Sequence, residues 1–235
     1  MNELQLLLVS AASLSFIHTL LGPDHYLPFI VLSKARKWSQ SKTLWITFLS
    51  GVGHVGGSVV LGITGVALGM SVGKLENIEA QRGNIVGWML IIFGLFYTFY
   101  GIYKFFKHGG HFHFPHFLLP KKIRELHHLP TDQESTPKED VTRLTPWILF
   151  LIFVFGPCEV LIPLLIYPAS EHNTLGIVLV SLIFGTATIS TMLAMVFLGY
   201  KGTSIIRFKK GEKYWHLIAG LIILIAGLGM QFMGW

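Results

Sequence analysis

Apolar residues along this 235-residue chain gather into long stretches rather than into the short periodic segments of a soluble protein. Six such stretches cover residues 5–32, 44–72, 84–103, 146–168, 175–200 and 214–235. A helix needs about 20 residues to cross the hydrocarbon of a bilayer, so each stretch is long enough. None of them alternates apolar and polar residues as the strands of a membrane barrel do. The pattern therefore predicts an all-α membrane protein with six transmembrane helices.

The composition supports this prediction. Hydrophobic residues make up 52% of the chain and charged residues 13%, which is about half the charged share of a soluble domain. The chain holds one cysteine, Cys158. A disulfide within the chain and a paired-cysteine metal site are therefore excluded.

Basic residues indicate how the helices are oriented. Of the 18 Lys and Arg residues, 16 lie in the loops 34–42, 104–143 and 201–213, and the other two are Lys74 and Arg82. Cytoplasmic loops carry an excess of Lys and Arg. We therefore expect these three loops to face the cytoplasm of an inner membrane and both termini to lie outside. The net charge of +6 is then explained without a nucleic-acid partner.

A weak internal repeat divides the chain into halves. The segment Gly22–Ile30 resembles Gly156–Leu165, and each lies in the first helix of a three-helix set. Proline interrupts a helix, so the first helix of each repeat is predicted to be broken at Gly-Pro. Three is odd, so the second half enters the membrane inverted, as in many transporters. We expect a first repeat at 1–103, a His-rich cytoplasmic linker at 104–144, and a second, inverted repeat at 145–235.

Ionisable and metal-ligating side chains lie inside the expected spans, around the two breaks. A charged group in a bilayer is costly and usually lines a cavity or a pathway. Imidazole, carboxylate and thiolate together suit transition metals. A single intramembrane histidine can still serve only as a hydrogen-bonding group, and a cysteine as a small apolar residue. The candidate metal ligands are His18, Asp24, His25, His54, Cys158 and Glu159.

The linker holds six of the chain's 11 histidines. Such a density favours capture of metal ions by the loop, although an accidental solvated tract is the alternative. These residues are His108, His111, His113, His116, His127 and His128.

The motif from His18 to His25 resembles the first-helix signature of nickel/cobalt permeases and their exporter relatives. The six spans, the inverted halves and the His-rich loop also look like the nickel/cobalt efflux branch of the lysine-exporter superfamily, which includes urease-accessory-like and sulfite-exporter-like membrane proteins. The resemblance implies His18, Asp24, His25 and His54 as ligands. One departure is that five residues separate His18 from Asp24, where the uptake permeases have four.

A second resemblance points elsewhere in the same superfamily. The segment Gly156-Pro157-Cys158 is similar to the Pro-Cys element of thiol-disulfide electron carriers. Those carriers need two membrane cysteines, and here Asp24 stands where the first would be.

Together these observations predict a transporter rather than an enzyme. The expected substrate is a transition-metal ion, with Ni²⁺ or Co²⁺ favoured and Zn²⁺, Fe²⁺ and Cu ions as alternatives. Access would alternate between the two sides, with proton coupling, because ligands lose protons when metal binds. The His-rich loop favours export. The expected partners are the lipid bilayer and the metal ion, and a homodimer is compatible with the sequence. Three alternatives stay open: an exporter of a small, sulfite-like anion, a thiol electron relay, and an accessory protein that delivers metal.

Overall fold

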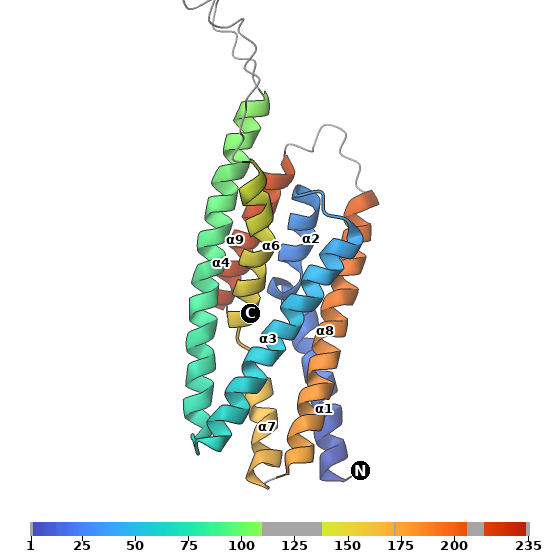
Figure 1. Ribbon diagram of the computed structural model, residues 1–235, viewed down its shortest axis with the longest axis vertical. Coiled ribbons are helices and arrows are strands. Elements are labelled where there is room, and N and C mark those ends of the chain that lie inside the picture. Colours follow the sequence, from blue (N-terminus) through green and yellow to red (C-terminus); the bar gives the residue numbers. More distant parts are fainter. Residues whose placement is uncertain (1, 110–137, 172, 206–213, 234–235) are drawn as a thin grey trace, which may run out of the picture.

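The computed structural model describes residues 2–109, 138–171, 173–205 and 214–233 (Figure 1). Within these ranges the regular elements are all helices and none is a strand. Five of the helices in the described part are long and apolar enough to cross a membrane. They lie at Glu3–Leu21, Gln40–Ala67, Val72–Lys104, Thr174–Thr203 and Trp215–Met233.

The first expected span consists of three elements. Helix α1 (Glu3–Leu21) begins in a capping box made by Asn2 and Gln5, and it ends at Gly22. The short 3-10 turn η1 (Pro23–His25) follows, and helix α2 (Leu27–Ala35) then continues in the same general direction (Figure 1). Proline lacks a backbone N–H and cannot continue the hydrogen bonding of a helix. The chain is therefore not helical in the ordinary sense between Gly22 and Tyr26.

Helices α3 (Gln40–Ala67) and α4 (Val72–Gly109) form a pair joined by a four-residue turn. Gly69 in this turn has φ +64°, a conformation that a glycine adopts readily. Helix α4 begins earlier than the sequence predicted. Residues 73–83, expected to form a polar loop, are instead the first turns of α4, because some of their polar side chains are buried against the protein.

The expected fourth span, 146–168, is divided in the structure. Helix α6 (Lys138–Phe155) ends before the Gly156-Pro157 pair, and helix α7 (Leu161–Ser170) begins after it. Their apolar parts, Leu144–Phe155 and Leu161–Ser170, are each too short to count as a span. Helices α8 (Thr174–Ile205) and α9 (Trp215–Met233) complete the bundle. Six complete spans and a symmetry relation between the halves therefore stay predictions.

Helices extend into the expected linker 104–144 from both of its ends. Helix α4 continues to Gly109, and α6 already begins at Lys138. Most of the segment between them lies outside the described residues, so the division of the chain into three regions also stays a prediction.

Glycines let α4 and α9 approach closely. A Cβ atom added to Gly220 would lie 2.4 Å from the backbone nitrogen of Thr98, and one added to Gly94 would lie 2.5 Å from that of Leu224. Gly101 and Gly227 meet the facing backbone in the same way. Small residues at such contacts are how membrane helices pack without a hydrophobic driving force between them. The two helices form the most extensive contact in the bundle.

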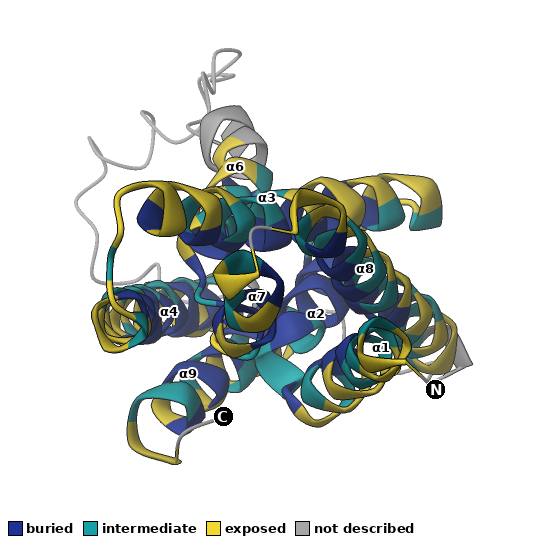
Figure 2. Cartoon of the chain, turned by 90° about the horizontal axis from the view of Figure 1, so that it is seen from below, coloured by how far each residue is buried: buried dark blue, intermediate teal, exposed yellow. Residues whose placement is uncertain are grey.

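Helix α2 occupies the interior of the bundle (Figure 2). Its residues from Pro28 to Ser33 are all buried, and it packs against α9, α8 and α3. Phe29 of α2 meets Phe153 at the end of α6, with ring centres 4.6 Å apart. The first break is thereby held close to the second.

The α4–α9 contact gives a direct test of this packing. We expect Gly220→Val to lower the free energy of unfolding by about 1–3 kcal/mol, because the added side chain overpacks the interface. Gly202→Val is the matched control, since a Cβ there meets nothing within 4 Å. Cys158 is fully buried, so a thiol-reactive fluorophore reports thermal unfolding. Equal melting temperatures for the two variants would contradict the close contact between α4 and α9 at Gly220.

Candidate functional site

Three imidazoles from three elements meet at the first break. His18 lies in the last turn of α1, His25 ends η1, and His54 lies midway along α3. The ring centres of His18 and His25 are 5.0 Å apart, and those of His25 and His54 are 5.2 Å apart. His25 and His54 are each 4% exposed. We call these three residues the imidazole cluster.

Hydrogen bonds fix the tautomer of two of the rings. Nδ1 of His25 lies 3.2 Å from the carbonyl oxygen of Gly22, and Nδ1 of His54 lies 3.3 Å from that of Phe153. A carbonyl oxygen only accepts, so each Nδ1 carries the hydrogen and donates it. The Nε2 atom of each neutral ring then holds a lone pair. A histidine that is ready to bind a metal is oriented in this way.

The Nε2 atoms have no partner inside the protein. Nε2 of His18, His25 and His54 is buried in each case and makes no hydrogen bond. A buried polar atom without a partner costs about 1–3 kcal/mol and calls for an explanation, such as an ion or a water. A ligand that accepts three nitrogen lone pairs would remove this cost.

The spacing of the rings suits such a ligand, but the side chains are not arranged around a common point. Two imidazoles on one tetrahedral ion, bound at about 2.1 Å, have ring centres about 5 Å apart. The ring planes are at 81° and 90° to one another. Among the described residues no group of three or more His, Cys, Asp or Glu side chains is arranged to hold a metal ion. These side chains would therefore have to rearrange as a cation binds.

Asp24 adds a carboxylate beside the cluster. Its Oδ1 lies 3.3 Å from Nδ1 of His25, and its side chain is 13% exposed. The same oxygen makes no hydrogen bond of good geometry. Gly22 makes room for this arrangement, since a Cβ there would lie 2.7 Å from Nδ1 of His25 and 3.0 Å from Oδ1 of Asp24.

The second break is held by side chains from another helix. Arg82 of α4 donates to the carbonyl oxygens of Val154 at 3.2 Å and of Gly156 at 3.1 Å. It also pairs with Glu79 at 2.7 Å. The other oxygen of Glu79 accepts the backbone N–H of Cys158 at 3.2 Å. We call Glu79 and Arg82 the α4 clamp.

Neither residue of the α4 clamp is among the site residues predicted from the sequence. Both lie between the expected spans 44–72 and 84–103, and Glu79 is fully buried. Their spacing of three residues, which suits an ion pair on one face of a helix, was the available signal. The carbonyl groups at the end of α6 have no helical partner, and the cationic guanidinium supplies one from the adjacent α4.

Cys158 and Glu159 do not join the imidazole cluster. The thiol of Cys158 is fully buried in an apolar cluster with Ala11, Leu161 and Phe184. Glu159 is exposed. Among the described residues, the hydrogen bonds, ion pairs and ring contacts do not link either of them to the three imidazoles. The buried carboxylate of the second break is Glu79 rather than Glu159.

The structure does not test the predicted capture of metal by the linker. His108 lies on the last turns of α4. The other five, which are His111, His113, His116, His127 and His128, fall outside the described residues.

Comparison with known proteins identifies the scaffold. The family described as "Cytochrome C biogenesis protein transmembrane region" matches residues 27–229, which is most of the chain. The chain belongs to this family. It is therefore an integral, multi-pass membrane protein whose helices contact the bilayer. No curated protein and no solved structure shows a significant match to the chain.

This finding corrects the family assignment made from the sequence. The resemblance to nickel/cobalt permeases and exporters is wrong, because the match is to the cytochrome c biogenesis family. The misleading signal was the His18–His25 motif, which lies outside the matched region; that region begins at Leu27. The match supports the thiol electron relay, one of the sequence-derived alternatives, better than it supports metal transport.

The α4 clamp can be tested with a double-mutant cycle. We expect Arg82→Gln to destabilise the protein by about 3–5 kcal/mol, because it leaves the carboxylate of Glu79 buried without a partner. The double variant Glu79→Gln/Arg82→Gln should regain much of this stability. Lys74→Gln, an exposed change of the same charge on α4, serves as the control. If the Arg82 variant unfolds no earlier than the Lys74 variant, the clamp does not hold the break.

Proposed function

We propose that the chain is a membrane carrier, not an enzyme, that binds a divalent transition-metal cation at the imidazole cluster. The observation that carries this proposal is the set of three buried Nε2 atoms without partners. Neutral imidazole binds Zn²⁺, Co²⁺, Ni²⁺, Cu²⁺ and Fe²⁺. The carboxylate of Asp24, beside His25, would offset part of the charge of the ion.

The two breaks supply the movement that a carrier needs. Transporters with interrupted helices bind their substrate at the breaks and rock one set of helices against the other. Here His54 contacts both breaks, since its ring faces His25 and its Nδ1 donates to Phe153 at the end of α6. Rotation of the His54 ring toward a cation would weaken its bond to α6. Binding of the ion and rearrangement of the second break would thus be linked.

A flux assay tests this function. In proteoliposomes that enclose a metal-sensitive dye, we expect the wild type to carry Zn²⁺ or Co²⁺ and His25→Ala and His54→Ala to carry neither. Loss of an outer partner of a ligand already costs about 10–100-fold in metal affinity, so loss of a ligand should cost at least that much. Titration calorimetry with Co²⁺ on the purified protein measures the same loss.

His216→Ala is the matched control. His216 is also a buried imidazole, but it lies at the start of α9 and contacts Tyr97 and Lys104. It should keep both flux and affinity. Equal flux in the wild type and in both cluster variants would refute the metal carrier.

A thiol electron relay is the second candidate, and the family match favours it. In such a relay a thiolate attacks a disulfide of another molecule, forms a mixed disulfide and releases a thiolate. A second thiol must then attack the mixed disulfide to regenerate the first. The chain has only Cys158, so both the disulfide and the second thiol would have to come from partners.

The reactivity of Cys158 separates the two candidates. Because the thiol is fully buried, we expect an aromatic disulfide reagent to react with folded protein at least about 100-fold more slowly than with unfolded protein. We also expect Cys158→Ser to retain metal flux. Fast reaction in the folded state, together with loss of activity in the serine variant, would favour the relay.

A further inference from the structure

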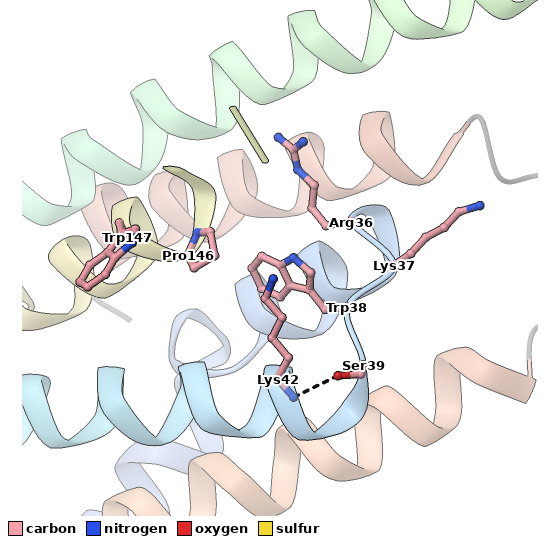
Figure 3. Close-up of a pocket in the computed structure, with 7 residues that line it drawn as sticks. All are labelled: Arg36, Lys37, Trp38, Ser39, Lys42, Pro146 and Trp147. Carbon is pink, nitrogen blue, oxygen red and sulfur yellow. Dashed lines mark hydrogen bonds between the residues drawn. The ribbon is translucent and has the colours of Figure 1, made fainter. Parts of the chain in front are cut away.

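A basic pocket lies at the end of the bundle where α2 turns into α3 (Figure 3). Its volume is about 560 Å³. The turn contributes most of its lining, and the first apolar part of α6 contributes the rest. The lining residues are Arg36, Lys37, Trp38, Ser39, Lys42, Pro146 and Trp147. We call this the α2–α3 pocket.

The charge of the α2–α3 pocket is one-sided. None of the described residues that line it is acidic, and two of its cations, Arg36 and Lys42, lie against aromatic rings. The ammonium group of Lys42 lies 5.7 Å from the ring centre of Trp38. The guanidinium of Arg36 lies 5.2 Å and 5.4 Å from the ring centres of Tyr97 and Tyr100. Its Nε atom is buried and makes no hydrogen bond.

Aromatic rings cannot neutralise these cations. A cation over a ring gains about 0.5–2 kcal/mol, far less than a charged partner supplies in a partly dry site. The charge of the pocket therefore favours the binding of an anion. Arginine presents a fork of donors that matches a phosphate, and lysine adds a point charge.

The position of the pocket indicates the source of the anion. Trp147 lines the same pocket as the cations, and tryptophan is enriched at the level of lipid headgroups. Trp147 is 66% exposed, and Ile148 and Leu151 on the same helix are exposed apolar residues. An occupant of this place would meet cations at one end and an apolar helix surface along its length, as a phospholipid does.

We propose that the α2–α3 pocket binds the phosphate of an anionic phospholipid, with its acyl chains along the outer face of α6. Basic pockets between transmembrane helices bind lipid headgroups in this way. Arg36 and Lys42 contact the phosphate, and Trp147 packs on the glycerol region. This site lies at the end of the bundle and is independent of the metal carrier.

Thermal unfolding in lipid–detergent micelles tests the site, again with a thiol-reactive fluorophore on Cys158. We expect phosphatidylglycerol to raise the melting temperature of the wild type by roughly 3–8 °C relative to phosphatidylcholine. Lys42→Gln should lose at least half of this shift. Arg36→Gln should lose it too, and Lys42→Gln decides alone if the Arg36 variant does not fold. Lys201→Gln, a cation outside the pocket, should keep the full shift.

Inorganic phosphate distinguishes the two sources of the anion. It should give no comparable shift, because it lacks the acyl chains. An equal shift with phosphate alone would replace the lipid by a soluble anion and overturn the proposal. The proposal also fails if the wild type shows no lipid-dependent shift, if both pocket variants keep it, or if Lys201→Gln loses as much as Lys42→Gln.

Discussion

The structure depends on how the backbone is satisfied where two helices are interrupted. Inside hydrocarbon, an unpaired N–H or C=O group costs several kcal/mol, so each break needs local partners. The first break supplies its own. The N–H of Gly22 donates to His18, that of His25 to Gly22, and the hydroxyl of Tyr26 to Leu20.

The backbone groups of the second break find their hydrogen-bond partners on other helices. Arg82 and Glu79 reach it from α4, and His54 reaches it from α3. The α4 clamp binds two carbonyl groups and one N–H group of the break. The second break therefore cannot move without exchanging these partners. The first break is instead closed by hydrogen bonds between its own neighbouring residues.

The sequence predicted some of this arrangement and could not predict the rest. Long helices follow from apolar length, which is a local property, so α3, α8 and α9 were predicted closely, whereas six complete spans stay a prediction. His18, His25 and His54 were also singled out, because each is an ionisable side chain inside an expected span. The α4 clamp was not predicted, because the hydrogen-bond partners of Arg82 depend on which helix packs against α4. The predicted role of Glu159 and Cys158 as ligands stays a prediction, and the structure shows that these neighbours at the break lie in different surroundings. Glu159 is exposed, whereas Cys158 is enclosed.

The family and the imidazole cluster bear on different questions. The match from Leu27 to Gly229 shows the family, and in this chain the two interrupted helices lie close together. What such a scaffold carries is decided by the groups at the breaks. A pair of thiols there can exchange electrons, but this chain has an aspartate and imidazoles at the first break and a single enclosed thiol at the second. Lone pairs on nitrogen cannot pass electrons as a dithiol does, yet they bind cations. Under the proposed function, therefore, the groups at the first break of this chain suit the binding of a cation better than the exchange of electrons.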